Sequence, residues 1–149
     1  MNNRELASLF TELADIMEIA GENHFKIRSY RKAAANIVQL QQNVSEMSAD
    51  EIIDIPGVGK AISEKIMTAI ETGSFAALDK WRATGFKSLT PLLLAEGLTP
   101  RILSRLLGGL RVDNFDDLRI AVDKGQLRKL DKIDAKVKDS VANYISKAR

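Results

Sequence analysis

The sequence contains no cysteine, one histidine and three prolines among its 149 residues. The absence of cysteine excludes disulfide scaffolds, thiolate zinc sites and cysteine nucleophiles. Because His24 is the one imidazole, a zinc protease site with two histidines is excluded, and a serine–histidine triad would rest on that residue alone. Nine glycines and three prolines are too few for a low-complexity, collagen-like or turn-dense all-β chain.

Aromatic residues and long apolar runs are also scarce. Eight aromatic side chains stand beside many Leu, Ile and Ala residues, a balance that favours helices over strands. No purely apolar run is longer than residues 92–95, whereas a spanning helix needs about 20 residues. Residues 1–5 lack the apolar core and the small-residue cleavage site of a signal peptide. We therefore expect a cytoplasmic protein with no membrane partner.

The formal charge of +2 is unevenly distributed. Residues 1–75 carry 7 basic and 11 acidic side chains, and residues 76–149 carry 15 basic and 9 acidic ones. The total charge does not require a nucleic-acid partner. The distribution nevertheless allows an electropositive footprint on part of the surface.

Apolar residues recur at helical spacing along most of the chain, which predicts an all-α fold, a helical bundle. One apolar stripe runs over residues 6–17, and Gly21 predicts the end of that helix. A second helix is expected from about Phe25. The tetrad Ser48-Ala49-Asp50-Glu51 is typical of a capping box, and a later helix is expected to end at Gly73.

The strongest pattern is an internal repeat. A shift of 40 residues superposes residues 55–78 on residues 95–118, and a weaker third copy appears at a shift of 75. Each copy predicts a helix, a tight hairpin and a second helix. The three hairpins are Gly57-Val58-Gly59, Gly97-Leu98-Thr99 and Lys132-Ile133-Asp134, so the first alone keeps both glycines.

A Gly-apolar-Gly hairpin in front of a helix is a candidate phosphate site. The two glycines allow a tight turn and the close approach of another molecule, while Val58 anchors the hairpin in the core. The N–H groups that begin the next helix lie at the positive end of its dipole and suit an anion, and Lys60 and Lys65 add positive charge. Such a site predicts salt-sensitive, sequence-independent DNA binding. The alternative, in which Gly57 and Gly59 only form a turn, stays open.

Two blocks of sequence carry a resemblance to a known family. Residues 50–78, DEIIDIPGVGKAISEKIMTAIETGSFAAL, resemble the first helix-hairpin-helix of X-family DNA polymerases, the group of DNA polymerase beta and bacterial PolX. Residues 23–37, NHFKIRSYRKAAANI, resemble the small N-terminal lyase domain of that family. The resemblance implies a lyase-like domain with the first hairpin over residues 1–82. It implies the second hairpin and a degenerate third over residues 83–149.

The resemblance implies a nucleoid-associated DNA-binding module for DNA repair that contacts the sugar–phosphate backbone at nicks, gaps or ends, with another repair protein as a further partner. The expected DNA contacts are Lys26, Arg28, Tyr30, Arg31, Lys32, Gly57, Val58, Gly59, Lys60, Lys65, Gly97, Thr99, Arg101 and Arg105. Hairpin carbonyls in this family also hold a monovalent cation, Na⁺ or K⁺, which by position implies Ile53, Ile55 and Val58. No other cofactor is expected.

The same resemblance implies an alternative function, the removal of a 5′-deoxyribose phosphate through a lysine Schiff base. The nucleophile of the family matches Lys65, and a nearby polar partner matches Glu64. Lys26 and Tyr30 match residues that hold the 5′-phosphate and shape its pocket. Schiff-base chemistry requires Lys65 to react as a neutral amine.

Three positions depart from the family's lyase pattern. Ala61 and Ala77 stand where lysines are expected, and Phe25 stands where a histidine is expected, with His24 one place away. The nucleophile is present, but much of the expected phosphate clamp is missing. We therefore expect a DNA-binding module, with the lyase as its alternative.

The family's polymerase palm has no counterpart in this chain. The acidic run Asp113-Asn114-Phe115-Asp116-Asp117 is the one candidate for its metal site, but the repeat predicts Asn114 as a helix N-cap and Asp117 as its partner. We do not expect polymerase activity from this chain alone. A third hypothesis is a protein-interaction module, favoured for the C-terminal half by Thr99, Lys132 and Asp134 at glycine positions of the hairpins.

Overall fold

The structure is a computed structural model that describes residues 1–148, and it contains helices and turns but no strand in that range. The all-α prediction is confirmed. The elements in chain order are α1 (Asn3–Ile19), α2 (His24–Gln39), η1 (Val44–Glu46), α3 (Ala49–Ile53), α4 (Lys60–Thr72), α5 (Ala76–Arg82), η2 (Gly85–Leu94), α6 (Pro100–Leu110), α7 (Phe115–Asp123), η3 (Leu127–Lys129) and α8 (Ala135–Lys147), where η marks a 3₁₀-helix. No helix among these residues is long and apolar enough to span a bilayer.

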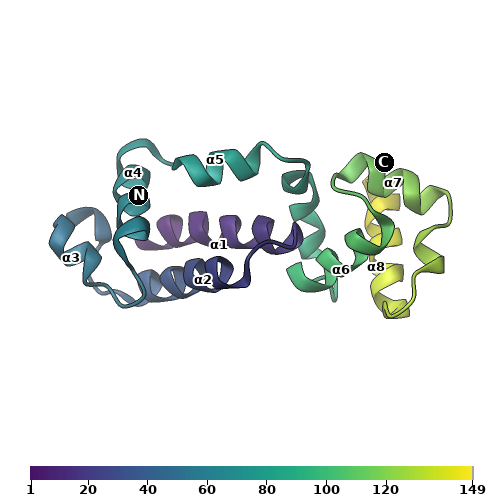
Figure 1. Cartoon of the computed structure of the whole chain (residues 1–149), viewed down its shortest axis with the longest axis horizontal. Coiled ribbons are helices and arrows are strands. Elements are labelled where there is room, and N and C mark those ends of the chain that lie inside the picture. The colour runs from purple at the N-terminus through teal and green to yellow at the C-terminus, as the bar shows by residue number, and fades with distance from the viewer. Residues whose placement is uncertain (149) are drawn as a thin grey trace. The chain divides into compact units, whose positions relative to one another are not determined.

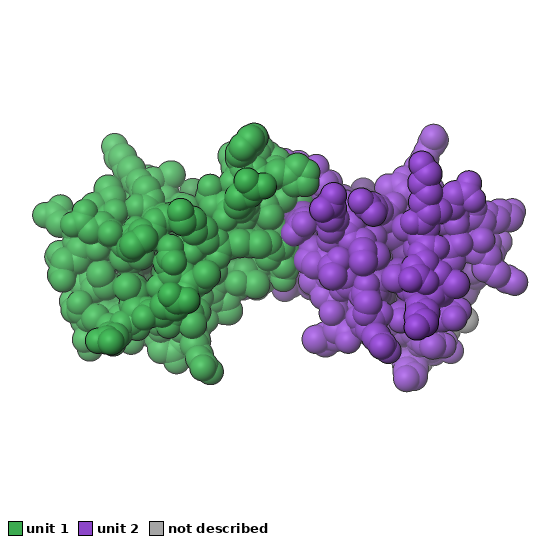
Figure 2. Space-filling model, turned by 90° about the horizontal axis from the view of Figure 1, so that it is seen from below, with its two compact units in different colours: residues 1–17, 23–81 green, residues 18–22, 82–149 purple. Residues whose placement is uncertain are grey.

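The chain divides into two compact units, which Figure 2 distinguishes by colour. Unit 1 comprises residues 1–17 and 23–81, and unit 2 comprises residues 18–22 and 82–149. Residues 18–22 lie in the first domain of the sequence-based division, yet they group with unit 2. Ile19 explains this, because it is buried in the core of unit 2.

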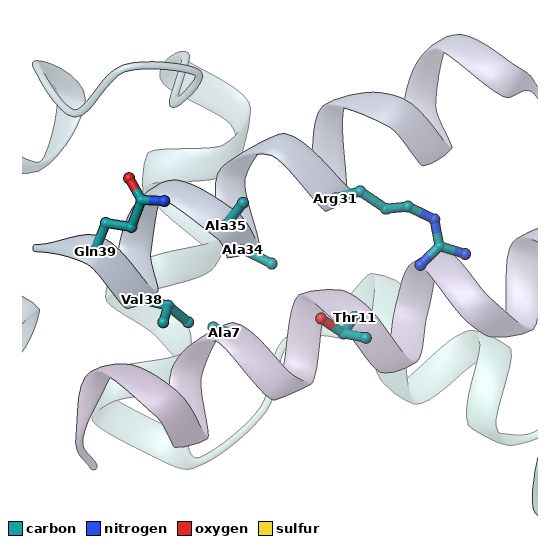
Figure 3. A pocket seen from close by; sticks show the side chains of 7 residues that line it. All are labelled: Ala7, Thr11, Arg31, Ala34, Ala35, Val38 and Gln39. Atoms are coloured by element: carbon teal, nitrogen blue, oxygen red, sulfur yellow. The ribbon is translucent and has the colours of Figure 1, made fainter. Parts of the chain in front are cut away.

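The core of unit 1 is built around α1 and α2, which lie side by side (Figures 1 and 3). Phe10 on α1 is fully buried and stacks on Phe75 with 5.1 Å between the ring centroids. Its ring also lies 6.1 Å from that of Tyr30 on α2. Ile66 of α4 is buried in the same core, which fixes α4 beside these helices.

Several local signals act as the sequence predicts. The Ser48 hydroxyl accepts a hydrogen bond from the Glu51 N–H, and the Glu51 carboxylate accepts one from the Ser48 N–H, completing the capping box of α3. Gly73 ends α4 with a φ of 87°. The Asn114 side chain accepts from the Asp117 N–H at the start of α7. The acidic run is therefore a helix start, as predicted.

The repeat is visible in the backbone. The first residue of each hairpin has a positive φ, 82° at Gly57, 78° at Gly97 and 64° at Lys132. The helix before the hairpin differs, because it is an α-helix in the first copy and a 3₁₀-helix in the other two. In the second copy Pro91 stands where the first has Glu51, so the capping box is lost and an amide donor is missing.

Candidate nucleic-acid interface

The first hairpin is held rigidly against α2. Val58 is buried, and its N–H donates to the Ile55 carbonyl at 2.9 Å. The Asn36 amide donates to the carbonyl of Pro56. Two features favour glycine at position 57. Its φ is 82°, and a Cβ there would lie 3.1 Å from both Asn36 Nδ2 and Lys32 Cγ. The hairpin is thus fixed by its own turn and by the close approach of α2.

Neither backbone conformation nor close packing requires a glycine at position 59. Its φ of −93° and ψ of −173° are extended values open to any residue. A Cβ at this position would meet no atom within 4 Å. Gly59 is the N-cap of α4, so no side chain of the cap residue covers the first-turn N–H groups. The absence of a side chain leaves this helix start open to an external acceptor.

A hollow of about 570 Å³ lies in front of this helix start; we call it the first hollow. It is lined by Phe25, Lys26, Ser29, Tyr30, Gly57, Gly59, Lys60, Ala61, Ile62 and Lys65. Three lysines and no carboxylate are in this lining. The structure thus gathers six predicted site residues from α2, the hairpin and α4 around one electropositive depression.

Lys65 and Tyr30 face each other across the first hollow. The Lys65 Nζ lies 6.0 Å from the centroid of the Tyr30 ring, within the range of a cation–π contact. Partial burial raises the pKa of the Tyr30 phenol above its ordinary value. The phenol is therefore protonated at neutral pH and can donate a hydrogen bond into the hollow.

The part of the chain that forms the first hollow matches a known protein family. The helix-hairpin-helix domain family matches residues 1–75. The chain belongs to the helix-hairpin-helix domain family. It is also 27% identical over 148 residues to DNA polymerase/3′-5′ exonuclease PolX of Bacillus subtilis (strain 168). That alignment covers 99% of this chain and 26% of that protein, so the chain spans about a quarter of the relative's length. The predicted resemblance to this group is confirmed.

Two residues that line the first hollow, Phe25 and Ser29, are not among the predicted site residues. Phe25 is 76% exposed although it is a large aromatic residue. The family resemblance singled out its position only because a histidine is expected there. Helical spacing was the available signal, since Phe25 and Ser29, like Lys26 and Tyr30, are four residues apart and share a face of α2.

The basic cluster predicted on α2 does not act as one surface. Arg31 pairs with Asp15 of α1 at 2.9 Å, and its side chain borders a separate depression of about 420 Å³ between these helices (Figure 3). The Lys32 chain packs beside Gly57. Arg28 is exposed and does not line the first hollow. Glu64, the predicted polar partner of Lys65, is also exposed outside this lining.

The second helix-hairpin-helix presents a different surface. The Thr99 hydroxyl accepts from the Ile102 N–H at 3.2 Å, so the start of α6 is capped by its own side chain. A second hollow of about 660 Å³ lies beside Gly97. Its lining includes three carboxylates, those of Glu96, Asp134 and Asp139, and one lysine, Lys136. Arg101 and Arg105 are exposed on α6 and do not line it.

The carbonyls predicted to hold a monovalent cation lie at the first hairpin. Ile53 ends α3, and the Ile55 carbonyl accepts the hydrogen bond of the turn from Val58. A carbonyl oxygen has two lone pairs, so this bond leaves acceptor capacity for a cation. Carbonyl oxygens are hard donors that suit Na⁺ or K⁺.

Proposed function

We propose that this chain binds the sugar–phosphate backbone of DNA without sequence preference and takes part in DNA repair. Its similarity to a polymerase and exonuclease supports DNA as the partner. The observation that carries the proposal is Gly59, whose missing side chain serves no internal contact and opens the start of α4 into a lysine-lined hollow. A helix start of this kind suits a phosphate.

Each group around the first hollow has a role in this proposal. The first N–H groups of α4 donate to one phosphate, and the helix dipole favours its charge. Lys26, Lys60 and Lys65 neutralise it, and the Tyr30 hydroxyl donates a further hydrogen bond. None of these groups reads a base, so binding is independent of sequence and weakens with salt.

Phe25 supports a preference for gaps, nicks or ends over intact duplex. Its ring is 76% exposed at the edge of the phosphate site. An exposed aromatic ring stacks on a base that has lost its neighbour, and such contacts are worth about 1–3 kcal/mol per base. The bases of an intact duplex are already stacked on each other and offer no free face.

Substitution of Gly59 tests the phosphate site. We expect Gly59→Ser to keep the fold, because the space is open, and to lower DNA affinity about tenfold, because the serine caps N–H groups that would otherwise bind phosphate. Gly108→Ala, on α6 and also in open space, is the matched control with unchanged affinity. Fluorescence anisotropy on a gapped duplex measures both. Unchanged affinity of the Gly59→Ser variant would refute the proposed site.

The preference for damaged DNA has its own test. Wild-type protein is expected to bind a gapped duplex more tightly than an intact duplex of the same length and ionic strength. Phe25→Ala should reduce that ratio by about fivefold or more, and Phe25→Tyr should retain it. Equal affinities of the wild type for both duplexes would show that the site does not distinguish gaps.

A second candidate function is the lyase, favoured by the position of Lys65 in the same hollow as Lys26 and Tyr30. The Lys65 amine would add to the C1′ aldehyde of a ring-opened deoxyribose and lose water. A proton would then leave C2′ and the phosphate on C3′ would depart, after which water frees the lysine. Borohydride reduction of the imine should trap a covalent adduct that Lys65→Ala abolishes. Absence of an adduct with the wild type would rule this function out.

We also propose that the carbonyls of Ile53, Ile55 and Val58 hold a monovalent cation that bridges to the phosphate. Replacing KCl by tetramethylammonium chloride at equal ionic strength should then weaken DNA binding, because the large organic cation cannot approach carbonyl oxygens closely. Equal affinity in both salts would argue against the cation.

A further inference from the structure

A short segment of unit 2 concentrates positive charge; we call residues 124–132 the basic segment. It carries four basic side chains, Lys124, Arg128, Lys129 and Lys132, and one acidic one, Asp131. The remainder of unit 2 has 10 basic and 9 acidic side chains. Nine residues with a net charge of +3 thus account for most of the net charge of this unit, which is +4.

Packing turns these charges outward. Leu127 is buried and Leu130 is half-buried, both against the core of unit 2. The four basic residues between and beside these anchors are exposed. Within residues 1–148 their side chains make no ion pair, so their charge is available to an external anion.

The backbone of the basic segment is fixed. The Lys138 Nζ on α8 donates to the carbonyls of Leu130 at 2.6 Å and Arg128 at 3.4 Å. Lys132 has a φ of 64°, at the position where the other hairpins have glycine. A lysine in this left-handed region is less stable than glycine would be, and it persists because the surrounding structure holds the backbone in this conformation.

The helix after this hairpin is closed to anions. The Asp134 carboxylate accepts from the Lys136 N–H at 3.0 Å and caps α8. A phosphate at this hairpin would therefore meet cationic side chains rather than backbone N–H groups. This binding mode differs from that of the first hollow.

We propose that the basic segment is a second contact for the phosphate backbone of DNA, made by the side chains of Lys124, Arg128, Lys129 and Lys132. It rests on the proposed function only for the choice of DNA as the polyanion. A membrane surface fits less well, because the apolar residues of the segment face the core and leave no side chain to enter a bilayer. Point charges on exposed side chains suit a phosphate backbone.

The salt dependence of binding tests this contact. The slope of log K against log salt is negative, and each lost phosphate contact should reduce its magnitude by about 0.9. In the full chain, the triple change Arg128→Gln, Lys129→Gln, Lys132→Gln should therefore reduce the magnitude of the slope by about 2.7. Between about 50 and 200 mM salt, the wild type should lose about 40-fold more affinity for a long duplex than this variant does.

The matched control removes the same charge elsewhere, by Lys80→Gln, Arg111→Gln and Lys147→Gln, and should keep the wild-type slope. Equal slopes for the wild type and the basic-segment variant, or an equal fall in the control, would overturn the proposal. The proposal would also be overturned if the basic-segment variant lost binding to phosphatidylserine vesicles while its DNA binding stayed unchanged. A fall in slope with Gly59→Ser without effect would uphold this contact while refuting the first hollow.

A pair of glycine substitutions separates local charge from backbone effects. Arg111 also has a positive φ, 58°, and ends α6. Both Lys132→Gly and Arg111→Gly remove one positive charge and place glycine at a position with left-handed backbone conformation. Both substitutions should therefore remove backbone strain and raise the unfolding temperature. Only Lys132→Gly should weaken DNA binding. Equal affinities of the two variants would overturn the proposal.

Discussion

The first and second hairpins share a backbone. Gly57 and Gly97 have φ values of 82° and 78°, and each is followed by a buried apolar residue, Val58 or Leu98. The turn N–H of that residue donates to the carbonyl three residues earlier, at 2.9 Å in the first hairpin and 3.3 Å in the second.

Their surroundings are opposite in character. The first hairpin has an N-cap without a side chain and three lysines around its hollow. The second has a threonine that caps its own helix, and three carboxylates outnumber the one lysine, Lys136, around its hollow. A repeated hairpin backbone therefore does not by itself make a phosphate site, because the cap residue and the charge of neighbouring elements decide whether an anion can bind.

The largest expected effect comes from adding a methyl group to each hairpin. Gly57→Ala and Gly97→Ala both force alanine into a left-handed conformation, at a cost of about 1–2 kcal/mol. At Gly57 the new Cβ also lies 3.1 Å from Asn36, whose bond to the Pro56 carbonyl would be disturbed at a further cost of about 1 kcal/mol. At Gly97 the nearest atom is 3.7 Å away, an ordinary contact.

Chemical denaturation measures this difference, followed by Trp81 fluorescence for unit 1 and by amide exchange at residues 100–147 for unit 2. The Gly57 variant should lose the larger stability and also its DNA affinity. Equal losses in both variants would mean that the approach of α2 to the first hairpin does not contribute.

The next effect concerns charge. Removing two carboxylates of the second hollow with Glu96→Gln and Asp139→Asn should raise DNA affinity about thirtyfold at low salt, since each charge about 4 Å away is worth about 1 kcal/mol in water. Neutralising Glu46 and Glu71, which line neither hollow, removes the same charge and should have a smaller effect. If both pairs of substitutions raise affinity equally, DNA binding responds only to the net charge of the chain. The different charges that line the first and second hollows would then not explain a difference in phosphate binding.

A smaller effect distinguishes the helices before the hairpins. Ser48→Ala removes the cap of α3 and should cost about 1 kcal/mol at neutral pH. Ser88, its counterpart 40 residues on, caps no helix of its own segment and instead accepts from the Phe115 N–H, the first N–H of α7, at 3.0 Å. Ser88→Ala should therefore loosen the start of α7 and leave α3 intact, which amide exchange would resolve.

The same capping box predicts a pH dependence. Hydrogen bonds from the Ser48 backbone N–H and side chain lower the pKa of Glu51 below its ordinary value. Its contribution to stability is present above the ordinary value and is lost as the pH falls through the lowered pKa. The difference in unfolding free energy between wild type and Glu51→Gln should therefore shrink as the pH falls below the ordinary pKa of a glutamate. A difference independent of pH would exclude a role for the Glu51 carboxylate.

The sequence predicted what short-range chemistry controls. The capping box at Ser48, the N-cap at Asn114 and the helix end at Gly73 depend on residues within a few positions of each other, and all three are confirmed. The repeat likewise aligned Lys132 with Gly57, and the two share a positive φ.

Long-range packing was not predictable in this way. The acidic lining of the second hollow combines Glu96 with Asp134 and Asp139, which are brought together only when α8 packs beside the second hairpin. The pairing of Arg31 with Asp15 similarly depends on the register of α1 against α2. Neither has a local sequence signal, because charges on helix faces are usually solvated.

The smallest effect separates the cap from the charge. Thr99→Gly gives the second hairpin the cap residue of the first and should cost only a few tenths of a kcal/mol in stability. We expect DNA affinity to stay unchanged, because the carboxylates of the second hollow still repel phosphate. Anisotropy at low salt is the measurement. A severalfold rise in affinity would instead show that an uncapped helix start is sufficient to bind phosphate. If affinity rises only when Thr99→Gly is combined with Glu96→Gln and Asp139→Asn, a hairpin needs two features to hold a phosphate. These are an N-cap without a side chain and a lining with fewer carboxylates.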